Sequence, residues 1–210
     1  MKLHLICILI LNTTTHLSFA QSWPTQNRPV APGTQAIRWV PKAEELVSNR
    51  VIKLNGIGRG LLGGNSRQSV IVVLPRNTIE WYYSFTTSSD ATFNNQLKLA
   101  AQIGSALLVF TAGGPVFAGL ANEVIQRINV PAGSMPINSY VFLAQNINNF
   151  MNNGIGGYFP GTEMQGTMSG KMPIRHLRPE VYYIGLMNNS TFKAVNVSIE
   201  VVAIVMTPAP

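Results

Sequence analysis

Charged side chains are scarce in this 210-residue chain, at 11% of all residues, whereas ordinary soluble domains carry about 25%. There is one cysteine, Cys7, and histidine occurs three times. These shortages exclude a disulfide-stapled scaffold and any metal site built from several cysteine or histidine ligands. The low charge also indicates that part of the surface is covered by a partner, by a membrane or by the protein itself.

Residues 1–20 have the composition of a secretory signal peptide. Met1-Lys2 is basic, an apolar run extends from Leu3 to Leu11, and small residues precede a cleavage point after Ala20. Cleavage there removes Cys7, so the mature chain has no disulfide, no thiolate nucleophile and no cysteine ligand. We expect export to a periplasm, a cell surface or the extracellular space, and a bacterial source, because small secreted domains of eukaryotes depend on disulfides.

The net charge of +7 is concentrated near the N-terminus. Up to Ile79 the mature chain has eight basic residues against Glu44 and Glu45, and beyond it the two signs balance. This asymmetry has two interpretations: an extended basic leader over residues 21–45 that is simply solvated, or a region that attracts an anionic glycan, a lipid or an envelope protein. Export and the lack of a reading motif exclude a nucleic acid as partner.

The remainder of the chain, residues 46–210, reads as short strands separated by turns in a single domain. Alternation is clearest near the C-terminus, where Val195 to Val201 predicts one buried and one wet face. The turn residues predict two hairpins, one joining 70–74 to 79–86 and one joining 181–186 to 195–201. Further strands are expected over 51–54, 139–144 and 165–172. Six or seven such strands favour a mainly β fold, a β-sandwich.

An uncharged stretch between Lys98 and Glu123 is as long as a bilayer span. Gly113-Gly114-Pro115 interrupts it, which predicts two helices folded back as a hairpin, inserted in the sandwich at about 90–130 and capped by Asp90 or Thr92. The apolar positions that recur at helical spacing are Leu99, Ile103, Leu107, Phe110, Phe117, Leu120, Val124 and Ile128. An alternative has this hairpin, over residues 93–128, enter a membrane or bind a lipid through Leu107, Phe110 and Phe117.

Residues 179–188 followed by 195–204, and residues 74–85, resemble strand pairs of secreted jelly-roll modules such as the bacterial pre-peptidase C-terminal domain. The resemblance implies a jelly-roll-like β-sandwich with an accessory or binding role. It fails over residues 90–137, where helices are expected instead. The acidic calcium-loop residues found in some of these modules are missing here, so calcium is not implied.

The mature chain contains few side chains of the types that catalyse reactions. After cleavage, His176 is the remaining histidine and Asp90 the sole aspartate, and no nucleophile-elbow motif accompanies them. No cofactor and no metal are therefore predicted. A glutamate-dependent hydrolase is the third hypothesis, since two carboxylates suffice for glycoside hydrolysis. Its candidates are Glu80, Glu123, Glu163 and Glu180.

Aromatic residues provide the remaining functional signal. Trp81 and Tyr83 fall on one face of a strand and are able to form a stacking surface for sugar rings. Core packing is the stronger explanation, because a sandwich needs such large residues on its inner faces. Loops around Tyr158, and around Arg175 and His176, are where a ligand is more naturally met. The sequence thus predicts an exported, non-catalytic binding or structural interaction module, with a membrane- or lipid-active protein as the alternative.

Overall fold

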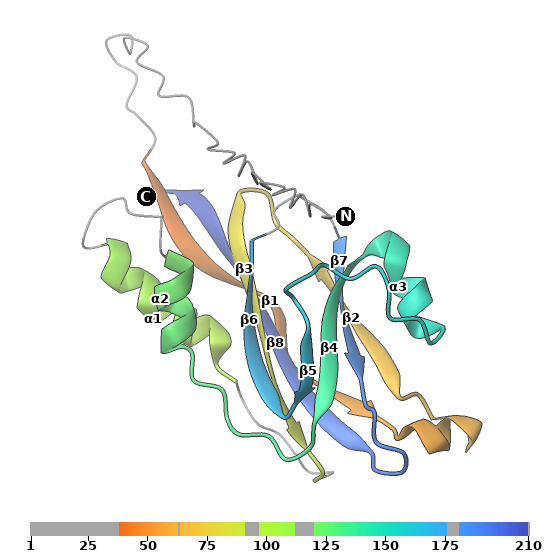
Figure 1. Cartoon of the computed structure of the whole chain (residues 1–210). Helices are drawn as coiled ribbons and strands as arrows, with labels where there is room; N and C mark the ends of the chain where they lie inside the picture. The colour runs from red at the N-terminus through yellow and green to blue at the C-terminus, as the bar shows by residue number, and fades with distance from the viewer. Residues whose placement is uncertain (1–37, 63, 91–96, 112–119, 176–180, 210) are drawn as a thin grey trace, which may run out of the picture. The chain divides into compact units, whose positions relative to one another are not determined.

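A computed structural model describes residues 38–62, 64–90, 97–111, 120–175 and 181–209, all within the compact unit Ile37–Pro210. The predicted signal peptide lies outside these residues, and so does the leader as far as residue 37. The described part is mainly β, with two four-stranded antiparallel sheets and three α-helices (Figure 1). This agrees with the predicted β-sandwich.

The strands pair in a nested order. The first sheet has the order β1 (Trp39–Leu54), β8 (Val195–Pro208), β3 (Thr78–Ser88) and β6 (Ser169–Ile174). The second has the order β2 (Arg67–Val73), β7 (Val181–Met187), β4 (Ile137–Leu143) and β5 (Met164–Thr167). The first strand therefore pairs with the last, the second with the seventh, the third with the sixth and the fourth with the fifth. Except for β4 and β5, consecutive strands lie in opposite sheets.

This order overturns both predicted hairpins. The strands near 70–74 and 79–86 are β2 and β3, yet β2 pairs with β7 whereas β3 pairs with β8 and β6. The terminal pair, β7 and β8, is likewise split between the sheets. The single strand expected over 165–172 divides into β5 and β6, again in different sheets. In addition, β1 begins at Trp39, within the range predicted as leader.

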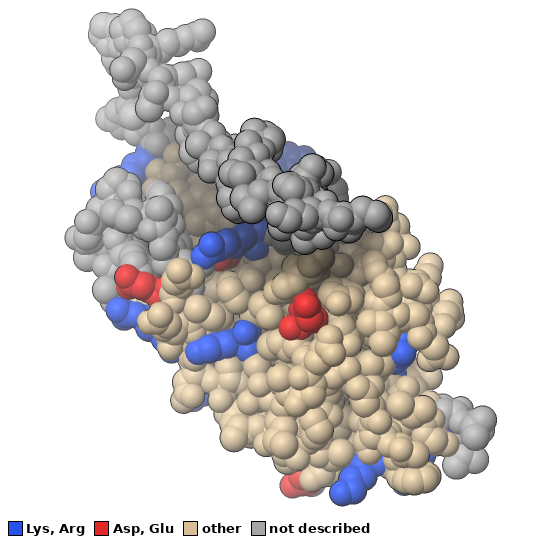
Figure 2. Space-filling view, viewed as in Figure 1, with Lys and Arg blue, Asp and Glu red and all other residues tan. Residues whose placement is uncertain are grey.

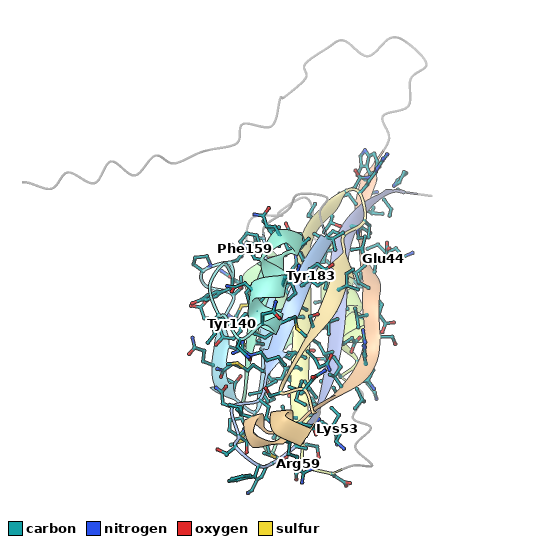
Figure 3. The ribbon with its side chains drawn as sticks, turned by 90° about the vertical axis from the view of Figure 1, so that its right-hand side faces the viewer. Glu44, Lys53, Arg59, Tyr140, Phe159 and Tyr183 are labelled. Carbon is teal, nitrogen blue, oxygen red and sulfur yellow. The ribbon has the colours of Figure 1, made fainter. Side chains whose placement is uncertain are left out.

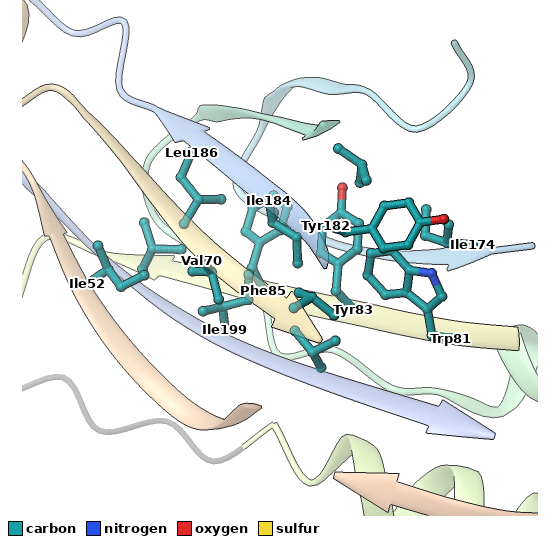
Figure 4. Close-up of a cluster of buried hydrophobic side chains, with 14 of the residues drawn as sticks. Ile52, Val70, Trp81, Tyr83, Phe85, Ile174, Tyr182, Ile184, Leu186 and Ile199 are labelled. Carbon is teal, nitrogen blue, oxygen red and sulfur yellow. The ribbon is translucent and has the colours of Figure 1, made fainter. Parts of the chain in front are cut away.

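The main core fills the space between the sheets (Figure 4). Trp81, Tyr83 and Phe85 of β3 are fully buried there, on one face as their spacing predicted. On β8, the valines predicted to be buried are buried, but the opposite face is not wet. Glu200 is only 3% exposed, because helices cover that face.

Two helices form a second apolar layer on the outer face of the first sheet. α1 (Leu99–Thr111), α2 (Leu120–Arg127) and the residue after α2 bury Leu99, Ile103, Leu107, Val124 and Ile128 against Tyr82, Val202 and Ile204. These five apolar positions were predicted from their spacing. The connection over residues 112–119, which includes Phe117, and the side chain of Phe110 lie outside what the structure describes. Neither α1 nor any other described helix is long and apolar enough to cross a bilayer.

The start of α1 differs from the prediction. The helix begins at Leu99 and not near Asp90 or Thr92, of which Thr92 lies outside the described residues. Its cap comes from β8: the Glu200 carboxylate accepts hydrogen bonds from the backbone N–H groups of Leu99 at 2.8 Å and Ala100 at 3.0 Å. A carboxylate is favoured at this position because the first N–H groups of a helix lack partners and carry partial positive charge.

Candidate binding surface

The segment from Ile128 to Thr162 contains no charged residue and seven asparagines. It supplies β4, α3 (Ala144–Met151) and the loop that leads towards β5. In Figure 2 the surface over β4 and β5 is correspondingly broad and tan, with few blue or red atoms. We call the exposed part of α3 with residues 152–158 the amide face.

α3 lies on the outer face of the second sheet, opposite to the side that carries α1 and α2 (Figure 1). Ile147 and Phe150, three positions apart, are its buried residues. Phe150 lies over Gly185 of β7, where an added Cβ would come within 2.8 Å of the Phe142 and Phe150 rings. Because Gly185 has no side chain, the Phe150 ring of α3 can pack directly on β7.

Arg67 of β2 holds the C-terminal end of α3. Its guanidinium Nη1 donates to the carbonyl oxygens of Phe150 at 2.6 Å and Gly154 at 2.7 Å, and the group lies 5.0 Å from the Phe150 ring centroid. Carbonyls at a helix end lack intrahelical donors, so a cation is favourable there. Partial burial lowers the pKa of Arg67 from its usual value, but an arginine remains protonated.

Two amides of α3 fasten the glycine-rich loop to the helix. Asn146 donates to the Gly157 carbonyl at 2.7 Å, and Asn149 donates to the Gly156 carbonyl at 3.3 Å. Gly157 has φ +89°, a conformation that glycine adopts at low cost. The loop then returns to the sheet, where Tyr158 forms an isolated bridge to Phe142. Helix and loop therefore form one continuous, pre-organised surface.

The exposed side chains of this surface are uncharged and are mainly amides, with Met151 and Ile155 as exposed apolar neighbours. Gln145, Asn148, Asn152 and Asn153 are exposed, and each carries an amide that both donates and accepts. Tyr158 is half-buried beside them, with its ring 5.1 Å from that of Tyr140.

Aromatic rings support the amide face from below. Tyr140, Phe142 and Phe150 are buried beneath it, and Tyr183 is half-buried against them (Figure 3). Burial raises the pKa of Tyr140, so its phenol stays neutral at physiological pH. Arg67 is a cation that packs on the Phe150 ring, and the two carbonyls at the end of α3 engage it. The exposed face itself carries no charged side chain, so it suits an uncharged ligand rich in hydroxyl groups.

Trp81 and Tyr83, predicted as a stacking surface, are both fully buried between the sheets. The Tyr83 hydroxyl lies 3.2 Å from the Ser139 hydroxyl, and burial raises the pKa of Tyr83. The Trp81 ring packs 5.6 Å from that of Tyr182, and its indole N–H has no acceptor among the described residues. Their role here is packing, which is the other interpretation that the sequence left open.

Arg175, another predicted binding residue, lies on the opposite side of the molecule from α3. It donates to Glu80 at 3.1 Å, and the Tyr82 hydroxyl donates to the same carboxylate at 2.6 Å. Glu80 is buried, and burial raises its pKa despite both donors. The trio joins β3, β6 and the helical layer, where Arg175 also reaches Asn122 at 3.4 Å. His176 lies outside the described residues.

The structure does not assemble a catalytic pair from the proposed glutamates that it describes. Glu80 faces the helical layer on the first sheet, whereas Glu163 precedes β5 in the second. Glu123 is exposed on α2, and Glu180 lies outside the described residues. Over the described ranges, no three His, Cys, Asp or Glu side chains gather in a way that could hold a metal.

Of the three residues that the alternative hypothesis predicts to bind lipid, the structure describes the side chain of Leu107. Leu107 is buried in the layer between α1 and the sheet, so it cannot meet a membrane without unpacking the helix. Its neighbour Leu108 is 73% exposed. Phe110 and Phe117 lie outside the described side chains.

No protein-family model matches the chain, and no curated protein sequence matches it. The amide face therefore has to be interpreted from its own geometry. Apart from Tyr158, sequence reasoning missed it. The charge-free run and the i, i+3 spacing of Ile147 and Phe150 were the available signals.

Proposed function

We propose that the protein is an exported, non-catalytic binding module that recognises an uncharged glycan with its amide face. The single observation that carries the proposal is a pre-organised surface of exposed amides beside the half-buried Tyr158, without a charged residue between Ile128 and Thr162. Export is inferred from the signal-like residues 1–20. A bacterial source is inferred from the absence of cysteine in the mature sequence.

The nested strand order supports a finer fold assignment. A ribbon with pairs 1–8, 2–7, 3–6 and 4–5, rolled into two sheets, is a jelly roll, an architecture used by lectin domains among others. We therefore propose a jelly roll, in keeping with the resemblance to secreted modules, and propose that α1 and α2 form a hairpin inserted between β3 and β4. The link from this architecture to binding is analogy alone.

The chemistry of the face favours a neutral sugar over other ligands. Amide groups match hydroxyls because both donate and accept, and tyrosine rings pack against the apolar side of a pyranose. An anionic ligand would find no cation on the exposed part of α3. Arg67 is already engaged by two helix-end carbonyls.

The test compares two substitutions that each turn an exposed amide into a carboxylate of the same shape. Asn148→Asp places a charge on the amide face, and Gln126→Glu places one on α2, away from it. Wild-type protein and both variants are screened on an array of neutral and acidic glycans, and the best neutral ligand is titrated by calorimetry. We expect Asn148→Asp to weaken binding about tenfold or more, because sugar hydrogen bonds are lost and a charge is desolvated. Gln126→Glu should bind like wild type.

Three results would contradict the proposal. Binding of no neutral glycan on the array would end it, and so would equal effects of the two substitutions. A ligand that is cleaved during the titration, with the cleavage abolished by Glu163→Gln, would instead support the hydrolase hypothesis.

A further inference from the structure

Two exposed apolar side chains lie at the end of the sandwich where β1 finishes and β8 begins. Phe192 is 73% exposed and Ile57 is 55% exposed. They belong to two short connections, residues 55–59 after β1, which include the start of the 3-10 helix η1 (Ile57–Leu62), and residues 188–194 between β7 and β8. We call these connections and the two side chains the apolar tip. Scattered single hydrophobic residues are normal on protein surfaces, but an adjacent pair needs an explanation.

The two connections are fastened to each other by their backbones. Ile57 N donates to the Ser190 carbonyl and Gly58 N donates to the Thr191 carbonyl, each at 2.8 Å. An added Cβ at Gly56 would lie 2.7 Å from the Thr191 carbonyl oxygen, so glycine is required for this approach. The Phe192 ring lies close to Gly58, the residue after Ile57, since a Cβ at Gly58 would be 3.5 Å from its Cε1.

A buried side chain fixes the base of the tip. The Asn188 amide contacts the carbonyl oxygens of Leu54 at 3.4 Å, Asn55 at 3.2 Å and Lys193 at 2.8 Å. Its own oxygen accepts from Ser190 N at 2.9 Å. The tip is therefore held in shape before any partner arrives, which lowers the ordering cost of binding.

Three cations belong to the same segments as the apolar pair. Lys53 and Arg59 lie at this end of the sandwich (Figure 3), Lys193 follows Phe192 in the chain, and all three are exposed. Asp90 is the acidic residue that the described part of the chain places at this end, where its carbonyl accepts from the Asn196 amide at 2.7 Å. The positive residues outnumber the negative one.

We propose that the apolar tip docks the protein on the surface of an anionic bilayer. Phe192 and Ile57 enter the headgroup region while Lys53, Arg59 and Lys193 meet lipid phosphates, the combination that holds peripheral proteins on membranes. A nucleic acid or other soluble polyanion would leave Phe192 in water. An apolar protein groove would leave the three cations unmatched. The surface of an anionic membrane offers an apolar environment to Phe192 and Ile57 and phosphate groups to the three cations.

The test is sedimentation of the purified mature protein, residues 21–210, with phosphatidylcholine vesicles, with and without phosphatidylglycerol. We expect binding to the anionic vesicles alone, weakened by added salt. Phe192→Ser should lower the partition coefficient about tenfold or more, since one buried aromatic ring is lost. Lys193→Gln should lower it about fivefold. The matched control is Ile71→Ser on β2, which removes an apolar side chain that is 50% exposed and should leave binding unchanged.

Three outcomes would overturn the proposal: no sedimentation with anionic vesicles, equal binding by Phe192→Ser and Ile71→Ser, or a loss caused by Leu108→Ser instead. The last would assign the membrane contact to α1. The proposal does not depend on the glycan site, so Phe192→Ser should keep glycan binding intact and Asn148→Asp should keep vesicle binding intact.

Discussion

Replacing Glu200 is predicted to destabilise the protein more than any exposed glutamate would. Its two carboxylate oxygens accept from the first two N–H groups of α1, at 2.8 Å and 3.0 Å, and the residue is nearly inaccessible to water. In Glu200→Ala both donors lose their acceptor. A buried donor left unsatisfied costs about 1–3 kcal/mol, and Ala100 is only half-buried. We expect a total of about 2–4 kcal/mol, a large part of the roughly 5–15 kcal/mol that stabilises a typical domain.

Glu200→Gln separates the effect of charge from that of shape. The amide keeps one oxygen as acceptor but loses the charge that interacts with the helix dipole, so about half of the loss is expected, roughly 1–2 kcal/mol. Urea unfolding monitored by circular dichroism measures both values, and the midpoint should fall without a change in slope. Hydrogen exchange should accelerate first in α1.

The matched control is Glu44→Ala, which removes an exposed carboxylate from β1 (Figure 3). Exposed charges contribute little, so its midpoint should stay within the error of wild type. If Glu200→Ala and Glu44→Ala have equal midpoints, or if Gln is worse than Ala, the capping argument is refuted.

Three further outcomes follow from the described contacts. Burial raises the pKa of Glu80 above its ordinary value of 4.5. The contribution of Glu80 to the free energy of unfolding is therefore complete below pH 4.5, and it is lost as the pH rises through the higher pKa of the folded state. Glu80→Gln should remove this pH dependence from urea unfolding, unlike Glu123→Gln on the surface of α2. Gly185→Ala should cost about 1–3 kcal/mol in the same assay, because its Cβ meets the Phe150 ring. Arg67→Met should weaken glycan binding by loosening α3, detected by calorimetry together with faster hydrogen exchange in that helix, and unchanged exchange would contradict it.

Local periodicity was sufficient to predict much of the secondary structure. The alternation along β3 and β8 identified their core face, and the spacing of Leu99, Ile103 and Leu107 identified α1. These patterns depend on neighbours within one element, so a single sequence contains them. The described helices α1 and α2 lie on either side of residues 112–119, so the break at Gly113-Gly114-Pro115 falls outside the described residues and stays a prediction.

The pairing of strands could not be predicted in the same way. A turn such as that at Asn188 has the same composition whether the next strand returns beside the first or crosses to the other sheet. Here Asn188, directly after β7 of the second sheet, bonds through its side chain to the carbonyls of Leu54 and Lys193, which adjoin β1 and β8 of the first sheet. The cap of α1 was unpredictable for a similar reason, because Glu200 is 101 positions from Leu99.

The proposed binding surface was missed in the sequence because its main signal is a lack of charged residues. Asparagine has low helix propensity, so α3 gives a weak local pattern, and its helix depends on Phe150 packing over Gly185 and on Arg67 at its end. Those partners lie in other strands. Trp81 and Tyr83 were predicted to bind a ligand because aromatic side chains are common in sugar-binding sites. In a β-sandwich, however, the large rings on one face of an alternating strand pack between the sheets, and both residues are buried there.

The pairing of β1 with β8 also sets the order in which the domain can form. Trp39 faces Pro208 and Leu54 faces Val195 across that ladder, so nearly the whole domain must be available before its first strand finds a neighbour. Such long-range closure is slow, because the entropy of the intervening chain is lost before the contacts are gained. A chain still emerging from a ribosome or a translocation channel would leave β1 and β3 without the strand that lies between them. The protein would then remain open to chaperones or proteases until its last residues arrive.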